Sequence, residues 1–317
     1  MAYLRTRPAW AQLLIFFGMA FGIFILVSVV GVMILSNITG IKLLEMGDVS
    51  KWDLSKPGMV SFMRGMLIIQ FVGLFLLPTF LFAIFSDPHP AKFLGLRIVP
   101  AIYIILGVAL LFVAIPLVEL TGIFNHDFIP ETTRIGRWMK KSEDDAARQL
   151  VFLLQRNTPR ELLLNIIFIA VFAGIGEELF FRGVLQRILI KLFKSPIAGI
   201  MVTAIIFSAI HMQFYGFIPR LILGVLLGLI YWYSGSLWPA IIAHFVYDAF
   251  FIVLVYFNPS LATQDSPAFT AGNQAVMALF SLVLVAGIVY LMKKKSTTRY
   301  ADVYAGDLVK ETTPFTF

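Results

Sequence analysis

The stretch GIGEELFFRG, residues 174–183, places two adjacent glutamates and an arginine inside a long run of Ile, Leu, Phe and Val. An ionisable side chain in a membrane helix costs about 2.5–3.5 kcal/mol on insertion scales, so such residues usually face a cavity or a partner. We therefore expect Glu177, Glu178 and Arg182 to have a function.

The composition of the chain indicates a membrane protein. Of its 317 residues, 59% are hydrophobic and only 14% are charged, whereas soluble domains carry about 25% charged residues. The mean hydropathy is +0.89. The length alone would suggest two soluble domains, but the apolar excess favours one polytopic membrane domain. The chain has no cysteine, which excludes a disulfide framework and a cysteine nucleophile or metal ligand.

The expected fold class is all-α, a polytopic membrane helical bundle with about eight transmembrane helices. A spanning helix needs ~20 apolar residues, and eight segments qualify or nearly so. They are roughly residues 10–35, 60–85, 98–120, 161–181, 196–212, 217–234, 237–257 and 272–292. The first segment is too long for a signal-peptide core of ~7–15 residues, so we expect a membrane helix there.

Lysine and arginine in the short loops predict that both termini are cytoplasmic. Loops at about 213–216 and 258–271 contain neither residue. Segment 121–160 mixes both charge signs, which predicts an amphipathic element on the surface. The basic positions that set this orientation are Arg5, Arg7, Lys92, Arg97, Arg187, Lys191, Lys194, Lys293, Lys294 and Lys295. We therefore expect an integral, multi-pass membrane protein.

The stretch RGVLQRILIKLFK, residues 182–194, has an amphipathic helical period. We expect it at the cytoplasmic interface, either continuing the fourth helix or bending from it. The polar tail from Ser296 is expected to be flexible. The chain thus divides into an N-terminal part with three helices and the amphipathic segment, a core, a last helix and a cytoplasmic tail, which cover residues 1–160, 161–257, 258–295 and 296–317.

The charges at 177, 178 and 182 predict two different roles. Glu178 and Arg182 are one helical turn apart and can pair on one face, whereas Glu177 is offset by about 100°. The unpaired carboxylate in an apolar site can act as a general base. The alternative is a salt bridge that anchors the helix end, which explains Glu178 and Arg182 but not Glu177.

Two later segments carry further acid–base residues. His211 ends an apolar helix in FSAIHMQF, one turn after Phe207; alternatively it is an interface histidine bonded to a carbonyl. His244 and Asp248, in AHFVYDAF, are also one turn apart. They could be a general base with its orienter, a hydrogen-bonding pair, two metal ligands or a packing pair. Such residues on three successive segments favour one shared cavity over independent structural accidents.

The ordered pattern Glu-Glu-x-x-x-Arg (177, 178, 182), Phe-x-x-x-His (207, 211) and His-x-x-x-Asp (244, 248) resembles the CPBP family of intramembrane proteases. That family includes the type II CAAX prenyl endopeptidases, such as CAAX prenyl protease 2, and the bacterial Abi or bacteriocin-immunity proteins. The resemblance covers about residues 160–255. Its context includes EELFFRGVLQ and GVLLGLIYWYSGSLWPAIIAH.

The resemblance implies an endopeptidase that hydrolyses a peptide bond of a membrane-associated protein, with prenylated CAAX-type proteins as one substrate class. By analogy Glu177 would activate water and His211 would help to hold it. Glu178 would pair with Arg182, and His244 with the residue four positions later would stabilise the oxyanion. The family often has Asn there. An ionised Asp248 cannot donate a hydrogen bond, so it could instead be protonated by burial, orient His244 or ligate a metal.

The residues leave open whether a metal takes part. Glu177, His211, His244 and Asp248 could bind a divalent metal such as zinc, but the set also works as a metal-free glutamate protease, which we favour; no cofactor is firmly expected. The alternative function is a non-enzymatic membrane protein, namely an immunity factor, a scaffold or a transporter. The expected partners are the bilayer and a membrane-associated or lipidated protein. Nucleic acid is not expected, and the oligomeric state is not fixed.

Straight helices over these ranges would keep the three motifs apart. Glu177 and His244 would lie nearer the cytoplasmic side and His211 nearer the outer side, with a mismatch on the order of 15 Å. A tilt, a helix break or different boundaries for the short fifth segment would remove it. One shared site requires these side chains to lie within about 10 Å of each other.

Overall fold

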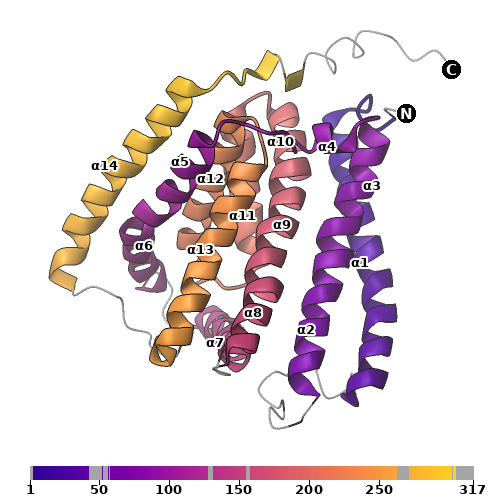
Figure 1. Ribbon diagram of the computed structural model, residues 1–317, viewed down its shortest axis with the longest axis vertical. Helices are drawn as coiled ribbons and strands as arrows, with labels where there is room; N and C mark the ends of the chain where they lie inside the picture. The colour runs from indigo at the N-terminus through magenta and orange to yellow at the C-terminus, as the bar shows by residue number, and fades with distance from the viewer. Residues whose placement is uncertain are drawn as a thin grey trace.

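The computed structural model describes residues 3–42, 52, 56, 58–127, 131–154, 158–262, 271–301, 303 and 304. Over these residues the protein is an all-α bundle without a strand (Figure 1). In the described part of the chain, six helices are long and apolar enough to cross a membrane. A seventh span is formed if the helices Ile102–Val113 and Ile115–Asn125, bent by 41°, count as one. The protein is an integral, multi-pass membrane protein, as the composition indicates.

The predicted segments correspond to elements in chain order, and the expectation of about eight helices is confirmed. The fifth is the shortest, a 15-residue apolar helix. In the order of the eight segments, the elements are α1 (Ala9–Thr39); α2 (Met59–Gln70), η3 (Phe71–Leu76) and α3 (Leu77–Ser86); α5 (Ile102–Val113) and α6 (Ile115–Asp127); α8 (Pro159–Asn165), η4 (Ile166–Val171), α9 (Phe172–Glu177), η5 (Glu178–Leu185) and α10 (Gln186–Phe193); α11 (Pro196–Ile210); α12 (Phe217–Ser234); α13 (Trp238–Phe257); and α14 (Ala271–Lys295). Short helices α4 (Pro90–Phe93) and η6 (Pro259–Ala262) lie in the connections.

The fourth span is longer than its predicted range of 161–181. One continuous helix runs from Pro159 to Phe193, so segment 182–194 continues the fourth helix and does not bend from it, and its place at the cytoplasmic interface stays a prediction. The first two polar side chains of this segment, Arg182 and Gln186, are buried against α12. Arg182 Nη2 donates to the Gly224 carbonyl at 3.0 Å, and Gln186 Nε2 donates to the Gly228 carbonyl at 3.2 Å. The amphipathic period therefore marks a helix–helix contact.

Wide helical turns and a close helix contact set the geometry of this fourth span. Two stretches, η4 and η5, are π-helical, a form that is rare and is found frequently at functional sites. Between them, a Cβ on Gly174 would lie 3.1 Å from the backbone nitrogen of Phe245. Glycine at this position therefore allows α9 to approach α13 closely.

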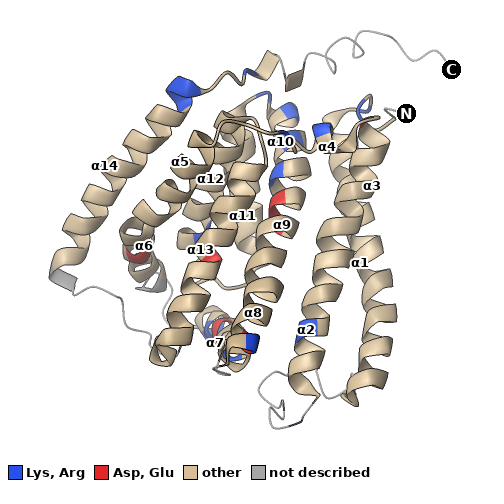
Figure 2. Cartoon of the chain, viewed as in Figure 1, with Lys and Arg blue, Asp and Glu red and all other residues tan. Residues whose placement is uncertain are grey.

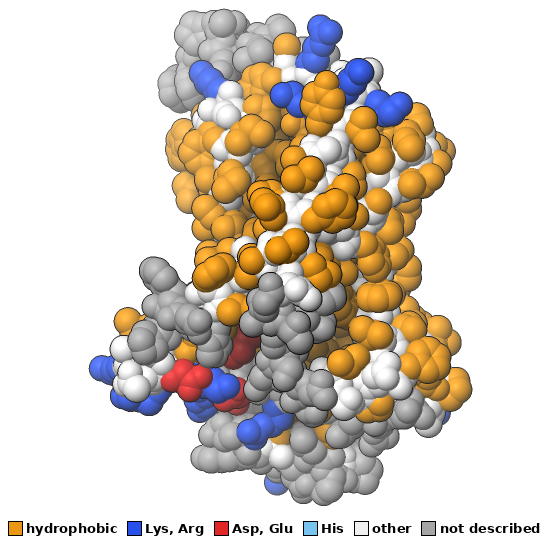
Figure 3. Space-filling view, turned by 90° about the vertical axis from the view of Figure 1, so that its left-hand side faces the viewer, with side chains coloured by type: hydrophobic (Ala, Val, Ile, Leu, Met, Phe, Trp, Pro, Cys, Tyr) orange, Lys and Arg blue, Asp and Glu red, His pale blue; other side chains and the backbone are white. Residues whose placement is uncertain are grey.

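On the face drawn in Figure 3, charged side chains gather at the two ends of the bundle with an apolar belt between them, whereas Figure 2 shows a few charged positions within the bundle, on α9, α13 and α6. The end opposite the basic loops holds α7 (Arg134–Leu154), which is amphipathic as segment 121–160 predicts. Its apolar side buries Met139, Phe152 and Leu153. The backbone nitrogen of Gly136 donates to the Thr133 hydroxyl at 2.9 Å, which caps the start of the helix.

Both terminal segments lie against α10, at the same end of the bundle. Lys191 Nζ donates to the Arg5 carbonyl at 3.3 Å, and the Tyr304 hydroxyl donates to the Arg187 carbonyl at 2.9 Å. Tyr304 is only 3% exposed, so this part of the tail, which we expected to be flexible, packs on the bundle. The shared end agrees with the loop charges, and its assignment to the cytoplasm stays a prediction.

Candidate active site

Glu178 and Arg182 form the ion pair that their helical spacing predicts. Arg182 Nη1 lies 2.6 Å from Glu178 Oε1, and both side chains are fully buried. The guanidinium also lies 4.8 Å from the centroid of the Phe207 ring. Buried charges need several partners to offset the loss of water. The Gly224 carbonyl and the Phe207 face supply such partners, which ties α12 and α11 to η5.

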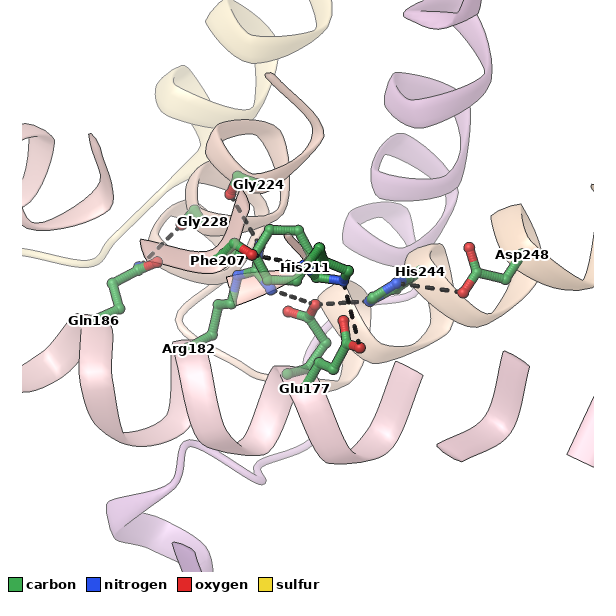
Figure 4. Close-up of polar contacts among 10 residues, drawn as sticks. Glu177, Arg182, Gln186, Phe207, His211, Gly224, Gly228, His244 and Asp248 are labelled. Atoms are coloured by element: carbon green, nitrogen blue, oxygen red, sulfur yellow. Dashed lines mark hydrogen bonds and ion pairs between the residues drawn. The ribbon is translucent and has the colours of Figure 1, made fainter. Parts of the chain in front are cut away.

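His244 joins this pair from α13. Its Nδ1 lies 2.9 Å from Glu178 Oε1, and its Nε2 lies 3.4 Å from Asp248 Oδ2 (Figure 4). A carboxylate at each ring nitrogen fixes the orientation of the imidazole. Of the roles left open for Asp248, this geometry favours that of an orienter for His244. The contact between Glu178 and His244, 66 residues apart, was not predicted from the sequence.

His211 and Glu177 face each other across the space beside this cluster (Figure 4). His211 Nδ1 lies 2.7 Å from the Phe207 carbonyl oxygen. A carbonyl can only accept, so Nδ1 carries the proton and Nε2 presents a lone pair in the neutral ring. That Nε2 lies 3.9 Å from Glu177 Oε1, which is too long for a direct hydrogen bond. Both atoms can therefore contact the same small group between them.

The depth mismatch expected from straight helices is absent because the fourth helix ends later than its hydropathy indicates. Glu177 precedes the helix end at Phe193 by about 16 residues, and His211 follows the start of α11 at Pro196 by about 15 residues. At ~1.5 Å per residue, both therefore lie roughly 22–24 Å from the same end of the bundle. The boundary at fault is that of the fourth segment and not that of the fifth.

A cavity of about 300 Å³ brings four of the six predicted site residues together. Glu178 and Arg182 lie behind its wall and hold His244. A larger cavity of about 510 Å³ lies at the basic end of the bundle and contains none of the six, so the acid–base groups, and not the size, distinguish the candidate active site. The side chains and backbone that line the smaller cavity belong to Ala173, Glu177, Phe207, His211, Arg220, Leu223, Leu227, His244, Tyr247 and Asp248.

Sequence reasoning missed two polar residues of this cavity, Arg220 and Tyr247. Arg220 is an arginine inside the apolar helix α12, so the criterion applied to Glu177 would have found it. Tyr247 lies one turn after His244, on the same helix face. A search for polar residues near the histidine motif would have included it.

Arg220 connects the cavity to the amphipathic helix α7. Its Nη1 and Nη2 donate to the carbonyl oxygen and the side-chain Oε1 of Gln213, each at 3.0 Å. Gln213 Nε2 in turn donates to Glu143 Oε1 at 3.4 Å. Burial raises the pKa of the Glu143 carboxyl, and the Arg220 guanidinium opposes that shift. The cavity wall therefore extends through Gln213 to the surface helix.

The side chains at the cavity are a poor fit for the metal site that the sequence left open. Over the described residues, no group of three His, Asp or Glu side chains is arranged to hold a metal ion. Each ring nitrogen of His244 already faces a carboxylate. Glu177 and His211 remain as a pair of donors, whereas zinc sites use three or four protein ligands.

Comparisons with known proteins agree with the motifs. Residues 159–250 match the family model described as "Type II CAAX prenyl endopeptidase Rce1-like". This segment is therefore similar to that family. It contains all six predicted site residues, and it confirms the resemblance drawn from the three motifs.

A curated relative matches part of the same chain. The "Uncharacterized protein YpbD" of Bacillus subtilis (strain 168) is 33% identical over 98 residues, which are 30% of this chain and 47% of that protein. The match thus spans about half the length of the relative. No solved structure is significantly similar to the chain.

Proposed function

We propose that the protein is an intramembrane endopeptidase in which Glu177 activates the water that attacks a peptide bond of a membrane-associated protein. The observation that carries this proposal is the position of the Glu177 carboxylate, 3.9 Å from His211 Nε2 at a cavity enclosed by apolar helices. The Rce1-like match of residues 159–250 supports the reaction class.

In this proposal one water molecule donates to both acceptors. One O–H donates to the Glu177 carboxylate and the other to the lone pair of His211 Nε2, which leaves the oxygen lone pairs free for the carbonyl carbon. Attack transfers a proton to Glu177 and forms a tetrahedral intermediate with a negative oxygen. Glu177 then gives this proton to the leaving amine, which completes hydrolysis without a covalent enzyme intermediate.

The oxyanion requires hydrogen-bond donors in the same cavity. The Tyr247 hydroxyl and the Arg220 guanidinium are donors that line the cavity. His244 Nε2 lies 3.4 Å from Asp248, so its N–H can be shared between Asp248 and the oxyanion. Asp248 acts in this scheme by orienting His244, because an ionised carboxylate has no proton to donate. Glu178 and Arg182 position His244 from behind.

The proposed substrates are membrane-associated or lipidated proteins, with CAAX-type prenylated proteins as the class to which the family description refers. The cavity of about 300 Å³ is at the small end of ligand pockets. It therefore suits a short extended peptide segment better than a folded chain.

Replacement of the proposed base by its amide tests the mechanism. Glu177→Gln keeps the shape of the side chain but cannot take a proton, so we expect peptide cleavage to fall by about 10²–10⁴-fold, the usual contribution of a general base. The measurement is hydrolysis of quenched fluorescent peptides, farnesylated and unmodified, by protein reconstituted in liposomes.

Glu131→Gln is the matched control, because Glu131 is exposed and does not line this cavity. It should cleave at the wild-type rate. Retained cleavage by Glu177→Gln would overturn the mechanism. A second arm adds a chelator: unchanged cleavage supports water activation by Glu177 alone, and loss of cleavage that zinc restores contradicts it.

A further inference from the structure

The larger cavity, of about 510 Å³, lies where the two terminal segments meet the basic loops. Among the described residues that line it, four are cationic and one is acidic: Arg5, Lys92, Arg97 and Arg187 against Asp87. Arg5 Nη1 lies 2.9 Å from Asp87 Oδ2, which balances one positive charge. Cationic side chains therefore outnumber acidic ones in the described lining of this hollow.

Backbone contacts fix the direction of Arg97 in this cavity. Leu237 N donates to the Gly95 carbonyl at 2.9 Å, and the Ser236 hydroxyl donates to the Arg97 carbonyl at 2.6 Å. Arg97 Nε donates to the Gly235 carbonyl at 2.5 Å. Gly235 has a φ of +64°, and a Cβ there would collide with Arg97 Nη2. The turn after α12 thus holds the guanidinium at the cavity wall.

Arg187 is held in the lining of the same cavity by aromatic residues. Its guanidinium lies 4.9 Å from the centroid of the Phe93 ring, and its Nη1 lies 3.4 Å from the Tyr231 hydroxyl. Tyr304, from the C-terminal segment, donates to the Arg187 carbonyl and lines the same cavity. Aromatic side chains with polar tips suit the level of lipid head groups.

The orientation of the chain in the membrane does not explain this arrangement. Basic residues in cytoplasmic loops are expected wherever a helix ends, but the four cations come from the N-terminal segment, the 87–97 connection and α10. Lys293 and Lys294 end α14 and are exposed without lining the cavity. The four cations that line the cavity therefore share a position that the general excess of basic residues at this end does not require.

We propose that this cavity binds a phosphate ester, either the phosphoryl group of a lipid head group or that of a soluble molecule. Guanidinium groups present paired N–H donors that match phosphate oxygens, and a lysine adds a point charge. The cavity shares no lining residue with the candidate active site. Arg187 follows Glu177 by about ten residues, or ~15 Å along one helix, so the two sites lie on one continuous helix.

Thermal unfolding of the full chain in neutral detergent tests this site with two probes. Dioctanoyl phosphatidic acid represents the lipid source and glycerol 3-phosphate the soluble source, with dioctanoylglycerol as the uncharged control. We expect the unfolding midpoint to rise with at least one phosphate probe and not with dioctanoylglycerol, because binding to the folded state stabilises it. A rise with only one phosphate probe identifies the source.

The double variant Lys92→Gln/Arg97→Gln should weaken the apparent affinity by more than about tenfold, as the loss of two basic contacts predicts. The matched control Lys293→Gln/Lys294→Gln removes the same charge at the same end and should change affinity by less than about twofold. Equal weakening in both variants would show general attraction to a basic surface and would overturn the proposal.

Two further readouts keep the test decisive. If neither phosphate probe raises the midpoint of the wild-type protein, the site does not exist. If the double variant unfolds without ligand at a lower temperature, Lys92→Gln alone, at an exposed position, should still weaken binding by about fivefold.

Discussion

Helix α1 and the helix Pro159–Phe193 are both strongly apolar, yet they lie in opposite environments. Only 11% of the most apolar window of α1 is buried, against 33% for the other helix, and every residue of η5 is buried. The sequence of α1 has no ionisable side chain, and large residues such as Phe21, Leu26 and Ile38 are exposed on it. Hydropathy therefore identifies both as membrane helices but does not separate contact with lipid from contact with protein.

Glycine and charge make the distinction that hydropathy does not. A Cβ on Gly18 or Gly22 of α1 would meet nothing within 4 Å, whereas one on Gly199 of α11 would lie 2.6 Å from Ile190 N. Small residues at helix contacts in membranes allow the backbones to approach closely. The difference teaches that glycine at positions 18 and 22 lies on an exposed helix face with open space beside it, whereas Gly199 is required for close packing.

The largest expected difference between the two regions concerns the buried ion pair. Arg182→Met leaves the buried Glu178 carboxylate with its contact to His244 but without the arginine charge, and an uncompensated buried charge costs about 3–5 kcal/mol. We expect the free energy of unfolding, measured by denaturant titration in detergent, to fall by at least about 3 kcal/mol. Helix α1 has no ionisable side chain to replace, so the comparison there is Phe21→Leu at an exposed position. We expect it to lower the free energy of unfolding by less than about 0.5 kcal/mol.

A double variant controls for the loss of the arginine side chain itself. Glu178→Gln/Arg182→Met removes both charges, so it should be more stable than Arg182→Met alone, because no unpaired charge stays buried. A double variant as unstable as the single one would mean that shape, and not charge, dominates at this position.

A smaller effect is expected from the glycines. Gly199→Ala pushes α11 away from the backbone of α10 and should lower the free energy of unfolding by about 1–3 kcal/mol, the usual cost of overpacking. Gly18→Ala meets open space and should stabilise the protein by up to about 1 kcal/mol, since alanine is the better helix former. If the two variants change the free energy of unfolding in opposite directions, the contrast between the two regions holds. If denaturant titration shows a change in the same direction for both, the contrast is wrong.

The smallest expected effect is that of Asp248→Asn in the peptide cleavage assay. The asparagine oxygen still accepts from His244 Nε2, so the rate should change by less than about tenfold. Asp248→Ala removes the orienting group and should cost about 10–100-fold, as loss of such supporting partners does elsewhere. A loss with Asp248→Asn as large as that with Glu177→Gln would contradict an orienting role.

Much of the fold follows from the sequence because a bilayer imposes simple requirements. Three features depend only on the length and the helical period of a local segment, and both can be read directly from the sequence. They are the eight apolar segments, the amphipathic α7 and the pairing of Glu178 with Arg182. The division into four parts stays a prediction, and so does the cytoplasmic location of the termini.

The missed features depend on contacts between distant segments. Polar residues such as Arg182 and Gln186 end the apolar run near 181, but carbonyl groups of α12 accept their hydrogen bonds, so the helix continues inside the protein. The contact of Glu178 with His244 joins residues 66 positions apart, and no local signal marks it. Arg220 had such a signal, because a charge in an apolar helix is itself a reason to look for a site.

The continuous helix Pro159–Phe193 has a consequence for how the membrane itself acts on the protein. Its 35 residues extend roughly 50 Å, whereas the hydrocarbon core is about 30 Å thick, so the helix must tilt, protrude or deform the bilayer around it. Glu177 lies near the middle of that length. Hydrophobic mismatch at the helix ends therefore sets how far the carboxylate lies from water, and the acyl-chain length of the surrounding lipid becomes a variable of the proposed reaction.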